Sequence, residues 1–291
     1  MNRRLRLAPW LFLAPALVVA VVFHVWPFLN TVVLSFTDAS ALGGGSFVGG
    51  ENYVRLAQDP HFWLATRNTV LYVAVVVPLL VLLPLLLAVL VQPQIRGIGF
   101  FRSVFYSPVV ASMVVVGLIW TWMLASDGIV NQVLEAARII DAPLPFLTDS
   151  TLLLVSCMLV TVWKGLGYYM VVYLAALGNV SSEYHEAAQV DGANAARRFW
   201  SVTVPGVRPT MFLVGLLSAI AAMKVFAEVY VMSYGTAGPG GEARTLVYTI
   251  REVGLGLGGQ IGYASAMSLA LFVLTIGFSA GYLRAQRAEA R

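Results

Sequence analysis

Three charged side chains lie inside long apolar stretches of this sequence, and their chemistry needs an explanation first. They are Lys164, Lys224 and Glu228. A charge near the centre of a membrane span costs about 2.5–3.5 kcal/mol on insertion scales, so each should have a partner or face a water-filled cavity. Lys224 and Glu228 are four residues apart and could neutralise each other on one helix face. The alternative, which stays open here, is that these charges line a polar path for a solute.

Aromatic residues stand close to the first of these lysines. Trp163 precedes Lys164, and Tyr168 follows it by four residues, so Lys164 and Tyr168 share a helix face. An aromatic ring beside hydrogen-bonding groups suits the apolar face and the hydroxyl rim of a sugar. The sequence therefore predicts a substrate pathway lined by Trp163, Lys164, Tyr168, Lys224 and Glu228.

A second polar feature is the interval Glu183–Pro209, whose first sixteen positions hold five charged residues although only 11% of the chain is charged. Ser181 is a good N-cap for a helix over Tyr184–Val190. Asp191–Gly192 is a turn pair, and helix can resume over Ala193–Trp200. We expect a helix–turn–helix elbow, which either packs its adjacent alanines against a partner protein or is an ordinary solvated loop.

The composition indicates the surroundings of these features. The chain has 291 residues, of which 59% are hydrophobic, and its mean hydropathy is +0.82. Soluble domains are about half apolar and a quarter charged, so we expect an all-α membrane protein. The net charge of +4 comes from basic residues scattered at the ends of apolar runs, which sets topology and does not predict nucleic-acid binding. The single cysteine, Cys157, excludes a disulfide framework.

Six charge-poor runs are long enough to cross a bilayer, which takes about 20 apolar residues. The expected spans are about 9–36, 68–92, 102–125, 151–178, 207–232 and 261–284, within a single transmembrane domain of residues 1–291. The basic start resembles a signal peptide, but the first apolar run is too long for one, so an uncleaved span is expected. Eleven Arg residues fall in the inner segments and five in the outer ones when the N-terminus is inside. Both termini and the elbow are therefore predicted to be cytoplasmic.

The elbow also carries a spacing that resembles a known family. Glu186-Ala187-Ala188, three residues, Gly192, nine residues and then Val202-Thr203-Val204-Pro205 are similar to the EAA signature of binding-protein-dependent ABC importer permeases. Both aliphatic positions of the signature are Val here, a mild departure. The stretches Tyr184–Ala193, Asn68-Thr69, Trp163–Tyr168, Lys224–Phe226 and Gly262–Ala266 resemble the carbohydrate-uptake branch of that family, the maltose- and glycerol-3-phosphate-type permeases, and its first, maltose-type subunit.

The resemblance implies that this chain is one of several subunits with separate roles. It makes this chain a six-helix permease of the bacterial inner membrane with a coupling loop over residues 181–205, between the fourth and fifth spans. A second permease subunit, two ATPase subunits that hold ATP-Mg, and an extracytoplasmic solute-binding protein that delivers a sugar-type solute would complete the importer. The implied ATPase-coupling residues are Glu186 as polar anchor and Gly192 as bend, with Ala187, Ala188, Asp191 and Pro205.

Two other classes of function remain as alternatives. A self-sufficient secondary transporter would run on an ion gradient and usually shows inverted repeats, which the sequence lacks. A membrane enzyme or scaffold would need a catalytic constellation or a large soluble surface. The pattern at Gly277–Gly281 fits GxSxG but lies in the sixth span, where small residues serve helix packing. The chain has no Walker A pattern, and its three His fall in separate segments, so neither ATP hydrolysis nor a metal site is expected on it.

Overall fold

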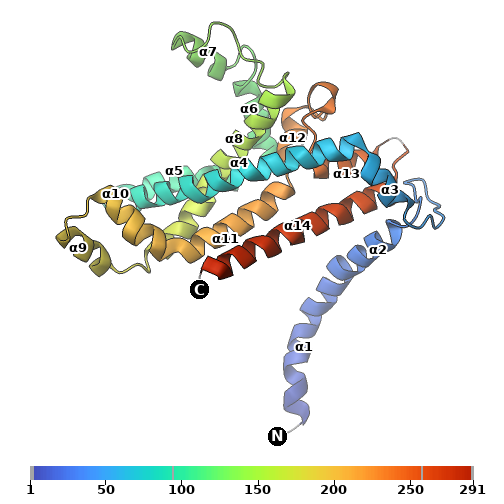
Figure 1. Ribbon diagram of the computed structural model, residues 1–291, viewed down its shortest axis with the longest axis horizontal. Helices are drawn as coiled ribbons and strands as arrows, with labels where there is room; N and C mark the ends of the chain where they lie inside the picture. The colour runs from blue at the N-terminus through green and yellow to red at the C-terminus, as the bar shows by residue number, and fades with distance from the viewer. Residues whose placement is uncertain (1–2, 94, 257, 290–291) are drawn as a thin grey trace. The chain divides into compact units, whose positions relative to one another are not determined.

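The computed structural model describes residues 3–93, 95–256 and 258–289 (Figure 1). These residues are almost entirely helical. The pairing of extended backbone among them is a single isolated bridge between Thr37 and Phe47. The predicted all-α fold is therefore confirmed.

The helices follow one another along the chain, and most of the connections between them are short. Their bounds are α1 Arg3–Ala20, η1 Val21–Val25, α2 Trp26–Leu34, α3 Glu51–Gln58, α4 Pro60–Val91, α5 Ile98–Val110, α6 Met113–Met123, α7 Ile129–Ala136, α8 Ser150–Leu177, α9 Ser182–Val190, α10 Ala195–Arg198, η2 Phe199–Thr203, α11 Val204–Met223, α12 Ala227–Met232, η3 Pro239–Gly241, α13 Leu246–Leu255 and α14 Ile261–Glu289. The short helices α3, α7 and α13 lie between the predicted spans.

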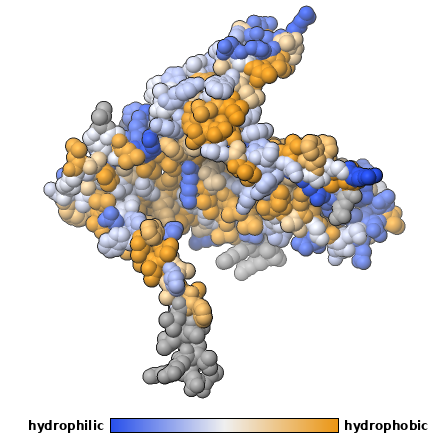
Figure 2. Space-filling model, turned by 180° about the vertical axis from the view of Figure 1, so that it is seen from behind, coloured by the Kyte–Doolittle hydropathy of each residue, from blue (hydrophilic) through white to orange (hydrophobic). Residues whose placement is uncertain are grey.

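Five helical runs in the described part of the chain are long and apolar enough to cross a membrane. They are Phe12–Leu34, Pro60–Val91, Ser150–Leu177, Ala195–Met223 and Ile261–Gln286. A sixth candidate is the pair Ile98–Val110 and Met113–Met123, which is bent by 100° at its break. On the face shown in Figure 2, apolar residues cover a large part of the surface, as expected for helices that meet lipid or other membrane subunits.

The third predicted span, residues 102–125, is divided between two helices at this bend. Ala111 and Ser112 have extended backbone, with ψ of 141° and 139°, and they separate α5 from α6. Pro108 lies one turn before this break and has no N–H for the helix ladder. The high hydropathy of residues 102–125 indicates that they avoid water, but it does not indicate where the backbone bends.

The fifth predicted span, residues 207–232, also needs correction. Helix runs without interruption from Ala195 to Met223 and so includes Pro205 and Pro209. It then breaks, because Phe226 has φ −147° and ψ −55°, before α12 begins. A π-helical turn, η2, precedes Pro205, and such turns accommodate backbone groups that a regular helix would leave unpaired. Helix therefore continues through both prolines at the entry to this span.

The chain divides into two compact units, and each is described by itself. The first comprises residues 1–62 and 249–274, and the second residues 63–248 and 275–291. In the first unit, Asn52 donates from Nδ2 to the carbonyls of Ser35 and Thr37 at 2.9 and 2.8 Å. The Tyr263 hydroxyl donates to Asp59 Oδ2 at 2.6 Å, and the Arg55 guanidinium lies 4.0 Å from the centre of the Tyr263 ring.

Asp59 stands just before α4, outside the apolar runs. Burial would raise the pKa of its carboxyl, but the hydrogen bonds from the Tyr263 hydroxyl and from the backbone N–H groups of His61 and Phe62 outweigh burial. The pKa of Asp59 therefore lies below its ordinary value.

The second unit is built around α8, whose buried side chains include Leu153, Met170 and Tyr173. Gly167 allows close packing, because a Cβ there would meet the backbone of Phe105 and Tyr106 in α5. A Cβ on Gly165 would meet side chains, most closely that of Leu80 in α4. Glycine at these two positions therefore brings α8 against α5 and α4.

The start of α4 holds the segment that follows α12 in the same unit. The buried Asn68 donates from Nδ2 to the carbonyls of Glu242 and Arg244 at 2.7 and 2.9 Å. Its neighbour Thr69 accepts from the backbone N–H of Leu246 at 3.0 Å. Both residues belong to stretches that resemble carbohydrate permeases, and their visible role is to fix this segment.

Candidate functional site

The elbow between α8 and α11 is formed by two capped helices. The Ser181 hydroxyl accepts from the backbone N–H of Glu183 at the start of α9. Asn194 Oδ1 accepts from the backbone N–H of Arg197 at the start of α10, at 2.9 Å. Figure 1 shows α9 and α10 at the end of α11 that lies away from α12. Side-chain caps on both helices keep the elbow ordered where it leaves the bundle.

Gly192 closes α9 with a Schellman motif. Its φ of +77° is left-handed. The backbone N–H of Gly192 donates to the carbonyl of Gln189 at 3.0 Å, and that of Ala193 donates to the carbonyl of Ala188 at 2.9 Å. Arg198 also donates to Gln189 Oε1 at 3.0 Å, which joins α10 to α9. The turn therefore needs a residue at position 192 that tolerates positive φ.

Large apolar side chains are exposed on this polar elbow. Tyr184, Val190 and Trp200 are 66%, 88% and 65% exposed. Glu186 and Ala187 are exposed beside them, while Ala188 is half-buried. Exposed apolar side chains gathered on one short segment are typical of a surface that a partner protein covers.

The charged residues of the apolar runs lie near two helix breaks. One break separates α5 from α6 and the other separates α11 from α12, and α8 packs against α5, α11 and α12. The α6 and α12 helices also pack together, so closely that a Cβ on Gly117 would meet the side chain of Val231. Interrupted membrane helices expose backbone groups that can bind a solute or a charge.

Lys164 reaches one of these breaks. Its Nζ donates to the carbonyl of Val109 at 3.1 Å. That carbonyl is among the last four of α5 and so has no partner within the helix ladder. A cation at the negative end of a helix dipole is stabilising. The lysine therefore stabilises the end of α5 where the bent pair breaks.

Glu228 lies in the same polar cluster. Its Oε1 accepts from the Thr161 hydroxyl at 3.4 Å, and Thr161 lies three residues before Lys164 on α8. The Thr161 hydroxyl also meets the Tyr72 hydroxyl at 2.5 Å, and Tyr72 donates to the carbonyl of Cys157 at 2.9 Å. The structure thus places Lys164 and Glu228 in one polar cluster, to which Thr161 and Tyr72 also belong.

The remaining predicted pathway residues are placed differently. Lys224 is exposed at the C-terminal end of α11. Because helix stops between Lys224 and Glu228, the alternative in which they pair on one helix face is wrong. The Trp163 ring packs edge-on against Trp120 at 5.5 Å between centroids. It also lines an apolar groove of about 540 Å³ between α4 and α8. Tyr168 is exposed and stacks edge-on with Tyr169 at 5.1 Å.

Sequence reasoning missed Thr161 and Tyr72. Thr161 stands three residues before Lys164 and therefore shares its helix face, a signal that could have been used. Tyr72 lies 89 positions before Thr161, so nothing local connects the two. Among the described residues no group of three His, Cys, Asp or Glu could hold a metal ion.

Comparison with known proteins gives concordant matches. The profile of a family described as binding-protein-dependent transport system inner membrane component matches residues 68–287. The lactose transport system permease protein LacF of Rhizobium radiobacter is 34% identical over 281 residues, which cover 96% of this chain and 94% of LacF. The trehalose/maltose transport system permease protein MalF of Thermococcus litoralis is 30% identical over 280 residues, covering 96% of this chain and 93% of that protein.

A solved structure has the same fold. It belongs to a bacterial ABC transporter involved in the import of the acidic polysaccharide alginate. The TM-score is 0.83 at 21% identity, with 98% of this chain and 96% of the other covered.

Proposed function

The chain belongs to the family of binding-protein-dependent transport system inner membrane components, and we propose that it translocates a sugar-type solute as one permease subunit of an ATP-driven importer. The family predicted from the elbow spacing is therefore confirmed, and with it a multi-pass location in the inner membrane and a non-enzymatic role. The finer parts of the proposal concern the solute, the path and the coupling to ATPase partners.

The cluster at the two helix breaks is the observation that carries the proposed path. Lys164, on α8, and Glu228, on α12, stand near the points where α5 and α11 are interrupted. In membrane transporters, such interruptions supply free backbone groups at the solute site. Trp163 and Tyr168, on the same helix, offer aromatic faces for a sugar ring. Lys224 stays part of the proposed path as an exposed cation at the end of α11.

A sugar-type solute is supported by the relatives and by the cluster. LacF and MalF are named for the transport of lactose and of trehalose and maltose. Lys164 is already engaged by the Val109 carbonyl and lies near Glu228. Lys164 is therefore not available as a free cation for an anionic solute. This arrangement favours an uncharged solute.

The elbow supports coupling to an ATPase subunit. Glu186, Ala187 and Ala188 lie beside the exposed Tyr184 and Val190 on α9, and the capped turn with Asp191 and Gly192 fixes the angle toward Pro205. We propose that this surface binds an ATPase subunit that holds ATP-Mg, and that the second permease subunit binds another. The elbow and both termini of this chain then lie on the cytoplasmic side of the membrane. A second permease subunit and an extracytoplasmic binding protein complete the assembly.

Uptake by the reconstituted importer tests the path. The chain, a second permease and the ATPase subunits are placed in liposomes, and ATP-driven uptake of labelled lactose and maltose is measured with the binding protein outside. Lys164→Met and Glu228→Leu should lower uptake at least tenfold, since each removes one of the two opposite charges of the cluster and leaves the other without its counter-charge. Lys164→Arg, which keeps the charge, should retain more uptake.

Each part of the proposal has its own contrary result. Normal uptake by Lys164→Met, Tyr168→Ala and Lys224→Ala would contradict the proposed path. Uptake by the chain alone, driven by an ion gradient without ATP, would instead support a secondary transporter.

A further inference from the structure

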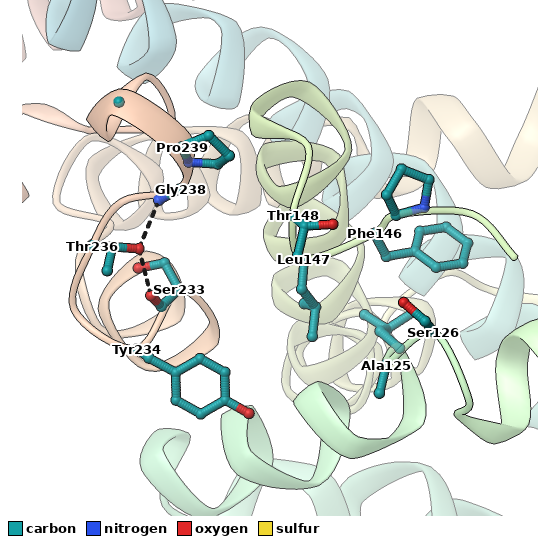
Figure 3. Close-up of a pocket in the computed structure, with 13 residues that line it drawn as sticks. Ala125, Ser126, Phe146, Leu147, Thr148, Ser233, Tyr234, Thr236, Gly238 and Pro239 are labelled. Atoms are coloured by element: carbon teal, nitrogen blue, oxygen red, sulfur yellow. Dashed lines mark hydrogen bonds between the residues drawn. The ribbon is translucent and has the colours of Figure 1, made fainter.

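A separate cavity lies at the opposite end of α8 from the elbow. Its volume is about 690 Å³, and it is lined by the residues that follow α6, the segment before α8 and the segment after α12. Figure 3 shows residues 233–239 along one side and residues 125–126 and 146–148 along the other. Lys164 is fourteen residues along α8 from Ser150, so the cavity is roughly 21 Å along the helix from that cluster.

The lining is uncharged and mixes apolar faces with hydroxyls. None of its thirteen residues is Asp, Glu, Lys, Arg or His. Tyr234 is 69% exposed and Phe146 lines the other side. The hydroxyls of Ser126, Thr148 and Tyr234 have no hydrogen-bond partner within the described part of the protein. Such a lining can pack the apolar face of a ring and bond to groups around its edge.

The wall that carries Tyr234 is held rigidly. Tyr234 and Ala237 have φ of 52° and 54°, a left-handed conformation that residues with a Cβ rarely adopt. The Ser233 hydroxyl accepts from the backbone N–H of Ala237 at 2.9 Å. The Tyr248 hydroxyl donates to the carbonyl of Gly235 at 2.6 Å. Strained backbone kept in place by its surroundings clusters at ligand sites.

The two sides of the cavity are also tied together. The Ser150 hydroxyl at the start of α8 donates to the carbonyl of Pro239 at 3.2 Å. Asn68 fixes the same segment further along, through Glu242 and Arg244. A preformed site loses less entropy when a ligand binds than a flexible one.

We propose that this cavity is a binding subsite for a neutral saccharide, separate from the charged cluster deeper in the bundle. The proposal rests on the proposed sugar import. Tyr234 stacks on the C–H face of a pyranose ring, and the hydroxyls of Ser126 and Thr148 bond to its edge. With no cation in the lining, the subsite does not compensate the charge of an acidic sugar.

Direct binding measurements test the subsite. The complex of this chain with its second permease and ATPase subunits is placed in nanodiscs without the binding protein. Saturation-transfer difference NMR then measures the affinity for lactose, maltose and the anionic lactobionate. Tyr234→Ala should weaken lactose and maltose binding roughly tenfold, because the stacking ring is lost. Tyr234→Phe, which keeps the ring, should weaken it less.

The matched control is Trp122→Ala. Trp122 is 74% exposed on α6 but is not part of the lining, so its removal should leave saccharide binding unchanged. Thermal unfolding of each variant checks that the fold is kept. Removing the two hydroxyls together, as Ser126→Ala with Thr148→Ala, should weaken binding even where the Tyr234 variant is unstable.

Several results would overturn the subsite. These are unchanged binding in both sets of cavity variants, no binding of either neutral sugar by the wild-type complex, or lactobionate binding as tightly as lactose. Cavity variants that keep saccharide affinity but lose affinity for the binding protein would make this a protein-docking surface instead. ATP-driven uptake by the wild-type importer judges the proposed function separately, so the two failures are distinguishable.

Discussion

Replacing Gly192 by Val is the sharpest perturbation of the elbow. Gly192 has φ +77°, and a Cβ built there meets no atom within 4 Å. The substitution therefore acts through the backbone preference of the turn and not through a contact of the Cβ with a neighbouring residue. A residue with a Cβ pays roughly 1–2 kcal/mol in the left-handed region, and a β-branched one is a strong outlier there.

This penalty is comparable with what holds the turn together. The Schellman motif contributes two backbone hydrogen bonds, from Gly192 to Gln189 and from Ala193 to Ala188. Each is worth about 0.5–1.5 kcal/mol net, so the pair gives about 1–3 kcal/mol. Val at position 192 removes most of that stabilisation. The equilibrium constant that favours the closed turn over its open forms then falls roughly tenfold. The direction of α9 relative to α10 is then no longer fixed.

The assay is the ratio of solute taken up to ATP hydrolysed in proteoliposomes that carry the whole importer and its binding protein. Gly192→Val should lower this ratio several-fold and leave thermal unfolding of the bundle close to wild type, because the elbow is exposed. Gly192→Asn is the matched control, since Asn adds a side chain but tolerates positive φ. It should keep most of the coupling.

Two outcomes would refute this reasoning. Full coupling in Gly192→Val would mean that the angle of the elbow does not transmit the ATPase movement. Equal damage by Asn and Val would mean that the bulk of any side chain matters at this surface, and not the backbone conformation.

Three further predictions concern stability. Gly167→Ala should lower the unfolding temperature markedly, because its Cβ meets backbone, whereas Gly165→Ala meets a movable side chain and should cost less; equal effects would contradict the packing argument. Asn68→Ala should destabilise by about 1–3 kcal/mol per carbonyl left unpaired, measured by thermal unfolding, and a neutral effect would count against its anchoring role. The lowered pKa of Asp59 gives stability that is present above about pH 4 and lost as the pH falls through its folded value. Asp59→Asn should therefore flatten the acid dependence of unfolding, and a wild-type acid slope in that variant would remove Asp59 from the explanation.

The elbow shows how much local sequence determines. The caps at Ser181 and the turn at Asp191–Gly192 depend on residues within a few positions of one another. Helix ends and turns are decided by such short-range hydrogen bonds, so the sequence predicted a helix–turn–helix elbow here. Apolar length likewise predicted where helices can cross a membrane, because a bilayer leaves few other solutions.

The intramembrane cluster shows the limit of that reasoning. Lys164, Lys224 and Glu228 were recognisable one by one, since each charge is costly in an apolar run. The groups that these side chains contact could not be recognised from the sequence. Lys164 bonds to a carbonyl freed by the bend after Val109, and Glu228 meets Thr161 and not Lys224.

The sequence by itself thus determined which residues must avoid lipid and which turns must form, because those depend on transfer free energies and on neighbouring residues. Only the tertiary structure decided where α5 and α11 break and which groups meet across α8. Those outcomes depend on packing between helices far apart in the chain, such as the contact of Gly167 with α5, for which local sequence carries no signal. The uncharged cavity beside Tyr234 arises in the same way, from three segments that only the fold brings together.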